Sequence, residues 1–340
     1  MPEISKAILL MNLGSPDSPS VKDVRRYLNE FLMDEFVIDI PYWRRTLLVK
    51  GLITPFRAPR SAAAYRSIWT ESGSPLIVIT NQLRNAVEQH SKLPTAVCMR
   101  YGAPGPAQAM DDLASEYPGL KEVILFPLYP HYAMSSYKSA VDYTKSIHRQ
   151  FGYSFQLKVV PPYYENHHYI HALSESIKSF LQDDFDKLLF SYHGVPERHI
   201  KKSDPTQMHC LSKTDCCRVE SPAHQYCYRH QVIRTTELVK EKLGLTDDQC
   251  YISFQSRLGR DEWLKPYTAG QLALFPKMGV KNLVVVCPAF TSDCLETLEE
   301  INEEGKNIFY QAGGEKFSIV PCLNTHSLWV DTIKELVLSA

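Results

Sequence analysis

The sequence predicts an α/β protein built from two similar doubly wound lobes. Short aliphatic runs, typical of strands buried on both faces, alternate with stretches of helical periodicity such as residues 21–32, 81–90 and 235–243. The 340 residues, 44% of them hydrophobic and 22% charged, are also more than one hydrophobic core usually organises. The third observation is an internal duplication, which gives both lobes the same order of elements.

The duplication is carried by two pairs of segments. Residues 7–14 and residues 187–194 are each an aliphatic run that predicts a strand ending in glycine. Residues 119–130 and residues 279–290 each begin with glycine and lysine, continue as an aliphatic strand and leave through proline. Chance similarity between short aliphatic runs is the alternative explanation.

The duplication also suggests where the lobes begin and end. We expect a first lobe over residues 1–160 and a second over residues 161–325, with a cysteine-rich insert at 203–229. The last segment, 326–340, has the pattern of a helix and is expected to pack back on the first lobe.

Charge and hydropathy narrow the possible partners. The net charge is -1 and no long basic run occurs, so nucleic acid is not an expected partner. No stretch of about 18 apolar residues predicts a membrane span, and no signal sequence is recognised, so a cytoplasmic location is expected. The apolar residues 31–33 and 36–38 could contact a membrane surface, or could simply belong to the core.

Four of the nine cysteines crowd one polar segment, at Cys210, Cys216, Cys217 and Cys227. Four thiolates can hold a [2Fe-2S] cluster or a zinc ion. Adjacent cysteines favour the cluster, because each can serve a different iron, whereas His209, His224 and His230 keep zinc open. Free thiols are the third possibility. The other cysteines lie among apolar neighbours and are expected to be small core residues.

The strand ends carry the unusual polar residues. In an open parallel sheet, ligands bind outside the carboxyl ends of the strands. His193 ends one predicted strand, and the other ends in a segment where Asp293, Glu296, Glu300 and Glu303 or Glu304 recur every three or four residues, as on one face of a helix starting near Thr291. The structural alternative is a helix N-terminus capped by Asp293 and Glu296.

Aromatic residues and arginines gather at the same strand ends. They include Trp69, Arg100, Tyr101, Tyr129, Tyr132, Tyr192, Arg257 and Trp263. Rings provide flat contact area and guanidinium groups pair with carboxylates, so a large flat anionic ligand would suit them, although core packing explains any one of them equally well.

Several motifs occur in one order along the chain, at residues 11–16, 73–76, 99–102, 127–130, 191–196, 254–257 with 263–264, and 290–298. With these motifs the chain resembles the ferrochelatase family over nearly its whole length. The resemblance implies a chelatase-like fold of two Rossmann-like lobes with four-stranded parallel sheets. It also implies a lyase of heme biosynthesis that inserts Fe²⁺ into protoporphyrin IX to form protoheme. A chelatase for coproporphyrin III or cobalt, and a non-catalytic porphyrin or heme carrier, are the alternatives.

The resemblance also assigns roles to individual residues. By motif match, His193 and Glu296 are the catalytic pair, and Asp293 and Glu300 join them in handling the Fe²⁺ substrate. Positions that correspond to the porphyrin pocket are Leu13, Tyr65, Ser74, Arg100, Tyr101, Tyr132 and Trp263.

The chain departs from the family pattern in two places. Cys294 stands where several relatives have a histidine, so the role of that histidine does not transfer. The chain also lacks the C-terminal cysteine group of the animal relatives. Some bacterial relatives have an internal cysteine segment instead, which Cys210, Cys216, Cys217 and Cys227 resemble, and this favours a [2Fe-2S] cluster over zinc.

Overall fold

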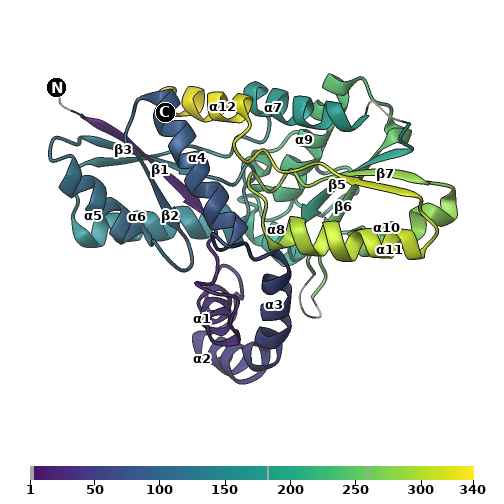
Figure 1. Ribbon diagram of the computed structural model, residues 1–340, viewed down its shortest axis with the longest axis horizontal. Helices are drawn as coiled ribbons and strands as arrows, with labels where there is room; N and C mark the ends of the chain where they lie inside the picture. Colours follow the sequence, from purple (N-terminus) through teal and green to yellow (C-terminus); the bar gives the residue numbers. More distant parts are fainter. Residues whose placement is uncertain (1–3, 182–183, 258, 260) are drawn as a thin grey trace. The chain divides into compact units, whose positions relative to one another are not determined.

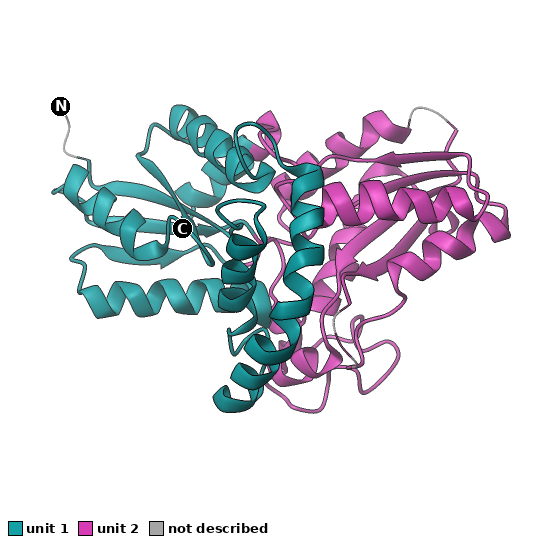
Figure 2. Ribbon diagram, turned by 60° about the horizontal axis from the view of Figure 1, so that its bottom comes forward, with its two compact units in different colours: residues 1–128, 134–161, 330–340 teal, residues 129–133, 162–329 magenta. Residues whose placement is uncertain are grey.

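The computed structural model describes residues 4–181, 184–257, 259 and 261–340. The chain forms two compact units (Figure 2). Unit 1 comprises Met1–Leu128, Met134–Pro161 and Val330–Ala340, and unit 2 comprises Tyr129–Ala133 and Pro162–Trp329. These ranges differ from the expected lobes in three places: Tyr129–Ala133 groups with unit 2, the boundary falls after Pro161, one residue later than expected, and the C-terminal return to unit 1 starts at Val330.

Unit 1 contains a four-stranded parallel sheet in the order β2-β1-β3-β4. Its strands are β1 (Lys6–Asn12), β2 (Thr95–Met99), β3 (Glu122–Pro127) and β4 (Gln156–Val159). The central strand β1 is buried from its second residue onward, which explains its continuous aliphatic sequence.

Unit 2 repeats this arrangement with a parallel sheet in the order β6-β5-β7-β8. Its strands are β5 (Lys187–His193), β6 (Cys250–Gln255), β7 (Asn282–Val286) and β8 (Lys316–Ile319). The two sequence pairs of the duplication fall on β1 with β5 and on β3 with β7, which are the two central strands of each sheet. The predicted fold class and the duplication are therefore confirmed.

The helices of unit 1 flank its sheet, apart from a group formed by its first helices (Figure 1). They are α1 (Val21–Leu32), α2 (Tyr42–Thr46), the π-helix η1 (Leu47–Ile53), α3 (Thr54–Ile68), α4 (Pro75–Ser91), α5 (Pro106–Glu116), the π-helix η2 (Met134–Lys138) and α6 (Ser139–Phe151). Helix α1 begins where expected, because the Ser20 side chain accepts a hydrogen bond from the Asp23 backbone N–H. In Figure 1, α1, α2 and α3 stand together away from the sheet.

Helices cover both faces of the unit 2 sheet (Figure 1). They are α7 (His167–Lys178), η3 (Ser179–Leu181), α8 (Glu197–Ser203), η4 (Pro222–Tyr226), α9 (Tyr228–Leu243), η5 (Asp247–Gln249), α10 (Thr268–Leu274), η6 (Phe275–Met278), the π-helix η7 (Glu296–Gly305) and α11 (Lys306–Gln311). The last helix, α12 (Ser327–Leu338), belongs to unit 1 from Val330 onward. Helices α7 and α9 pack together on one face, and α10 and α11 on the other. Among the described residues, none of these helices is long and apolar enough to cross a bilayer.

Strand order also fixes where a ligand can bind. In unit 2 the chain runs from β5 to β6 on one side, and then crosses to β7 on the other side of β5. Connections therefore diverge between the carboxyl ends of β5 and β7, which is the topological switch point where open α/β sheets bind ligands. His193 ends β5, and the segment that carries Glu296 follows β7.

Candidate functional site

His193 is held at the end of β5 by backbone contacts. Its Nδ1 lies 2.6 Å from the Gly194 carbonyl oxygen, which assigns the ring hydrogen to Nδ1 and leaves Nε2 as the unprotonated nitrogen. Its ring lies edge-on to Phe290, 6.2 Å between centroids. The imidazole is half-buried, so Nε2 can accept a proton or bind a metal.

Gly194 is required by close packing. A Cβ at this position would lie 2.8 Å from the Gln255 carbonyl oxygen and 3.1 Å from Cε3 of Trp263. The His-Gly sequence therefore lets β5 leave the sheet directly beneath the Trp263 ring. Trp263 is 8% exposed, and its indole Nε1 is buried without a hydrogen-bond partner within the described residues.

The acidic segment after β7 differs from its sequence prediction. The helix is a π-helix that begins at Glu296, and Leu295 is its N-cap residue. The expected helix is present, but its predicted start near Thr291 is wrong, and so is the structural alternative in which Asp293 caps it. The repeating carboxylates suggested an α-helix, but periodicity alone cannot separate the wider π turn from an α turn. Glu303 and Glu304 are exposed, so the far end of the predicted ridge faces solvent.

Asp293 lies before the helix and is buried. Its carboxylate accepts hydrogen bonds from the Thr297 hydroxyl (3.0 Å), the Cys322 backbone N–H (3.2 Å) and the Asn324 amide (2.7 Å). These bonds tie the start of η7 to the segment after β8. The expected role of Asp293 in handling iron stays a prediction, and the structure adds this anchoring role.

Glu300 is the most constrained carboxylate of the site. The Ser256 backbone N–H and hydroxyl donate to its two oxygens, at 2.8 and 2.5 Å. Burial raises the pKa of Glu300, the Ser256 hydroxyl and the nearby His193 act to lower it, and the negative charge of Glu296 raises it further. His193, Glu296 and Glu300 therefore form one electrostatically linked group.

Gln255 joins this group to the sheet. Its side-chain oxygen accepts from the Ser191 hydroxyl at 2.6 Å, and its amide donates to the Glu296 backbone oxygen at 3.3 Å. Gln255 also pairs with His193 in the β5–β6 ladder. Ser256, the next residue, has a φ of 66° and so lies in the left-handed region, which is unusual for serine. The motif at residues 254–257 is distinctive in the sequence, but no sequence signal reveals its backbone conformation.

Beside Glu296 lies Cys294, the residue that departs from the family pattern. Burial raises the pKa of its thiol well above its ordinary value, and the neighbouring Glu296 carboxylate adds to the effect. Cys294 is therefore a neutral thiol beside the carboxylate.

The two porphyrin-pocket candidates of unit 2 are Tyr132 and Trp263. Tyr132 is half-buried; its backbone N–H donates to the Gln231 side-chain oxygen at 2.6 Å, and its ring meets Tyr226 edge-on at 5.3 Å. In unit 1, Leu13 follows β1 and is half-buried, whereas Tyr65 on α3 and Ser74 before α4 are buried. Their contact with porphyrin stays a prediction.

Arg100 and Tyr101 are committed to a buried network in unit 1. The Arg100 guanidinium lies 2.5 Å from the Asp34 carboxylate and donates to the Ser139 hydroxyl at 2.7 Å. The Tyr101 hydroxyl donates to the same carboxylate at 2.8 Å, and Tyr101 is fully buried. Asp34 was missed by sequence analysis, because nothing in its local sequence distinguishes it from a surface acid. The predicted porphyrin contacts of Arg100 and Tyr101 are not tested by these bonds.

The cysteine segment brings its four thiols into buried positions in unit 2. Hydrogen bonds from the Cys210 and Cys217 thiols lower the pKa of the Cys227 thiol. The same hydrogen bonds raise the pKa of Cys210 and Cys217. Cys216 accepts from the Leu211 backbone N–H at 3.4 Å and from Arg229 at 3.7 Å.

Asp204 and three histidines hold this segment in shape. Asp204 accepts from the backbone N–H groups of His209 and Cys210, each at 2.8 Å. The imidazoles of His209 and His224 contact the Cys216 carbonyl oxygen, at 2.7 and 3.0 Å, and His230 contacts that of Cys217 at 2.6 Å. These ring nitrogens are therefore used on backbone oxygens. Within the part of the chain that the structure describes, no set of three or more His, Cys, Asp or Glu side chains is arranged for a single metal ion.

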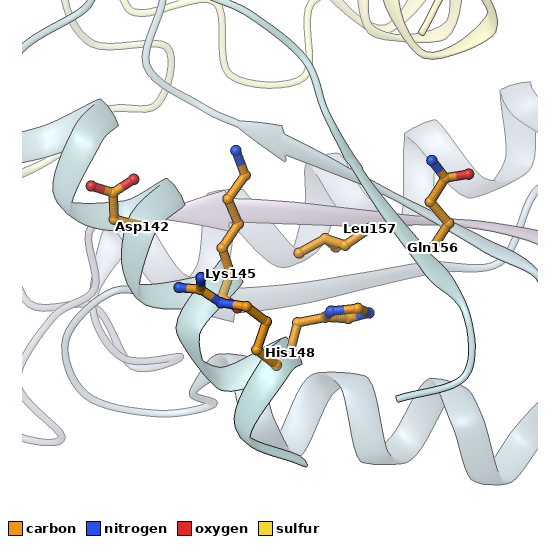
Figure 3. Close-up of a pocket in the computed structure, with 6 residues that line it drawn as sticks. Asp142, Lys145, His148, Gln156 and Leu157 are labelled. Carbon is orange, nitrogen blue, oxygen red and sulfur yellow. The ribbon is translucent and has the colours of Figure 1, made fainter. Parts of the chain in front are cut away.

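A surface hollow of about 650 Å³ lies elsewhere, on unit 1 (Figure 3). Asp142, Lys145 and His148 of α6 and Gln156 and Leu157 of β4 line it with Arg149. None of the predicted site residues lines this hollow.

Comparisons with known proteins identify the family of this chain. The sequence profile of the ferrochelatase family matches residues 5–340. A ferrochelatase of Stutzerimonas stutzeri strain A1501 is 47% identical, covering 97% of this chain and 97% of its own length. One of Ectopseudomonas mendocina strain ymp is 48% identical, over 97% and 96%. One of Porphyromonas gingivalis is 42% identical, over 98% and 95%.

Solved structures support the fold independently. The structure of SirB from Bacillus subtilis with Fe³⁺ matches with a TM-score of 0.54 and 10% identity, covering 99% of this chain and 95% of that chain. At this identity the match concerns the two-lobed chelatase fold alone. The profile and the close relatives decide the rest: this chain belongs to the ferrochelatase family.

Proposed function

We propose that this protein inserts Fe²⁺ into protoporphyrin IX to form protoheme, as a lyase of heme biosynthesis. The observation that carries the proposal is the grouping of His193, Glu296 and Glu300 at the switch point of the unit 2 sheet. A proton acceptor and paired carboxylates are the groups that metalation of a porphyrin needs.

The reaction has two obstacles. Two pyrrole N–H protons must leave, and Fe²⁺ must shed water before it enters the ring. His193 suits the first task, because its Nδ1–H is fixed on the Gly194 carbonyl and Nε2 is left to accept a proton. Glu296 suits the second, because its carboxylate can bind the incoming iron, and Glu300 can relay protons behind it. Each metalation thus releases two protons to the protein and then to solvent.

A kinetic split separates this assignment from the reverse one, in which the imidazole delivers iron. We expect His193→Ala to abolish turnover and Glu296→Gln to reduce it severely while both variants stay folded. The residual turnover of Glu296→Gln should show a raised KM for Fe²⁺. The residual turnover of a His193→Gln variant should instead show a low kcat at an unchanged KM for Fe²⁺. Near-normal turnover in both His193→Ala and Glu296→Gln would remove these residues from the chemistry.

Anaerobic incubation with Fe²⁺ and protoporphyrin IX tests the activity itself. A catalyst converts many equivalents of porphyrin, whereas a porphyrin or heme carrier stops at one. Parallel reactions with coproporphyrin III, and with Co²⁺ in place of Fe²⁺, test the other chelatases. Faster turnover in either arm would reassign the substrate.

We also propose that Cys210, Cys216, Cys217 and Cys227 hold a [2Fe-2S] cluster. The proposal is supported by the burial of all four thiols in one segment, by the hydrogen bonds of the Cys210 and Cys217 thiols to Cys227, and by N–H donors from Leu211, Arg229 and His230 on the sulfurs of Cys216 and Cys227. Zinc fits less well, since the nearby imidazoles are turned to backbone oxygens. When bound, the cluster would supply redox-active iron in the segment. Iron, sulfide and zinc analysis with visible spectra of freshly purified protein tests this.

A membrane surface is a further proposed partner, through helices α2, η1 and α3. Five large apolar side chains there are between 58% and 76% exposed, namely Tyr42, Trp43, Leu47, Leu52 and Phe56. Residues 40–70 also contain six Arg or Lys and no Asp or Glu. Exposed apolar side chains among cations favour a bilayer with anionic lipids. The surface predicted from sequence, 31–33 with 36–38, is only partly exposed.

A further inference from the structure

Helix α9 starts inside the cysteine segment. Cys227 is its N-cap residue, and the Cys227 sulfur accepts a hydrogen bond from the His230 backbone N–H at 3.5 Å. Tyr228 is the first residue of the helix and is 5% exposed. The Cys227 sulfur is bonded to the first turn of α9, and Tyr228 belongs to that turn. A shift of the Cys227 side chain is therefore passed to the backbone of Tyr228.

Tyr228 reaches from this helix to the end of β5. Its hydroxyl donates to the His193 backbone oxygen at 2.9 Å. Its ring meets the ring of buried His131 edge-on, 5.9 Å between centroids, and the His131 ring also meets Tyr192 edge-on at 5.6 Å. Packed side chains therefore surround the phenol, and it cannot shift unless the first turn of α9 shifts with it.

The end of β5 is held by β6 on one side, where the Gly194 N–H donates to the Gln255 carbonyl oxygen at 2.8 Å, but not by β7 on the other. Its pairing with β7 stops at Phe190, whereas pairing with β6 continues to His193. The Tyr228 hydroxyl is thus an additional anchor on the residue that carries the proposed base. A small displacement of this backbone oxygen would move the His193 imidazole, and misplacement by about 1 Å can cost a hundredfold in rate.

We propose that Tyr228 is a positioning residue that couples the cysteine segment to His193. The inference rests on the proposed functions of His193 and of the four cysteines, and it adds the route between them. The cysteine segment then affects metalation without touching iron or porphyrin, because its state sets the first turn of α9 and, through Tyr228, the end of β5.

The test uses the full-length protein with Tyr228→Phe, Cys227→Ser and the double variant. The control is Tyr310→Phe, which removes a phenol hydroxyl from exposed α11 of the same unit. Three quantities are measured: kcat and KM for both substrates, the iron and sulfide content, and the ¹⁵N signals of the His193 imidazole. These signals are assigned by their loss in His193→Gln.

Tyr228→Phe should keep its iron and sulfide, lower kcat by roughly ten- to a hundredfold and leave both KM values unchanged. Its His193 signals should move, whereas those of Tyr310→Phe should not. Cys227→Ser should also lower kcat and move the His193 signals. Adding Tyr228→Phe to Cys227→Ser should lower kcat no further, since both changes act along one route.

Two results would overturn the coupling: wild-type kcat with unmoved His193 signals in Tyr228→Phe, or a double variant in which the two losses multiply. A wild-type protein that binds neither iron nor sulfide would overturn the cluster proposal alone, and the Tyr228→Phe signals would still decide whether the phenol positions His193. A Tyr228→Phe variant with moved signals and normal kcat would show that His193 is not the base.

Discussion

Replacing Ser256 by alanine is expected to move the acid limb of the pH profile of kcat/KM to higher pH. In the wild-type protein, burial raises the pKa of Glu300, and the Ser256 hydroxyl acts against this by donating to the carboxylate at 2.5 Å. Alanine removes that donor and keeps the backbone N–H bond at 2.8 Å. The carboxylate loses stabilisation in its ionised form, so its pKa rises further.

The size of the shift follows from the strength of the lost bond. A hydrogen bond to a charged group contributes about 1.5–3 kcal/mol. One pKa unit corresponds to about 1.4 kcal/mol, so the acid limb should move up by about one to two pH units. Rate profiles from pH 5 to 9, measured anaerobically with saturating Fe²⁺, would record it.

The pH dependence of folding stability is a second check on Glu300. Its sign is opposite to that of a salt-bridged acid, whose contribution to stability is lost as the pH falls. Because the folded-state pKa of Glu300 is raised, its protonated form favours folding. That contribution is complete below the unfolded pKa of about 4.3 and is lost as the pH rises through the folded pKa. Ser256→Ala extends the loss to higher pH.

Ser256→Gly is the matched control. Glycine also lacks the hydroxyl, but it adopts the φ of 66° without strain, so this variant should be more stable than Ser256→Ala by about 1 kcal/mol. Both variants should shift the acid limb equally if the hydroxyl is the cause. An unmoved acid limb in both would refute the role given to Glu300.

Three further predictions concern other parts of the molecule. Gly14→Ala should lower the free energy of unfolding, measured in urea, by about 2–6 kcal/mol, because the φ of Gly14 is 105° and a Cβ there would lie 1.7 Å from the Tyr101 carbonyl oxygen. The control is Gly270→Ala, where a Cβ would meet open space and the free energy of unfolding should not fall. Burial acts to raise the pKa of Asp204, but hydrogen bonds led by the Cys210 N–H hold that pKa well below its ordinary value. The stability that the ionised Asp204 carboxylate gives to the folded protein should therefore be lost as the pH falls below about 4. Asp204→Asn should flatten the dependence of the melting temperature on pH in this acid range. Trp43→Ser with Leu47→Ser should weaken binding to phosphatidylserine vesicles at least about tenfold while turnover of soluble porphyrin persists; equal binding would exclude this surface.

Much of the fold could be predicted from local patterns. Residues 7–14 and 187–194 became β1 and β5, and the helical stretch 21–32 became α1 with the same bounds. A continuous aliphatic run has few alternatives to a strand covered on both faces, and similar runs in the same order imply similar sheets. The position of His193 at a strand end follows from the same pattern.

The carboxylate segment was predicted only in part. Spacing placed Glu296 and Glu300 together, but it could not exclude a π-helix or show that Asp293 would bind Asn324 instead of joining the helix. Both outcomes depend on segments outside the acidic stretch. No periodicity in a single segment records them.

The sequence by itself determined the α/β class, the duplicated strand order and the family, because these depend on hydrophobic pattern and on motifs that are local in the chain. Only the tertiary structure decided how the site residues are held. The bonds from Ser256 to Glu300, from Tyr228 to His193 and from Arg100 to Asp34 join residues 44, 35 and 66 positions apart. Such bonds form only after the sheets and helices have packed, when burial makes an unpaired polar group costly and so selects its partner.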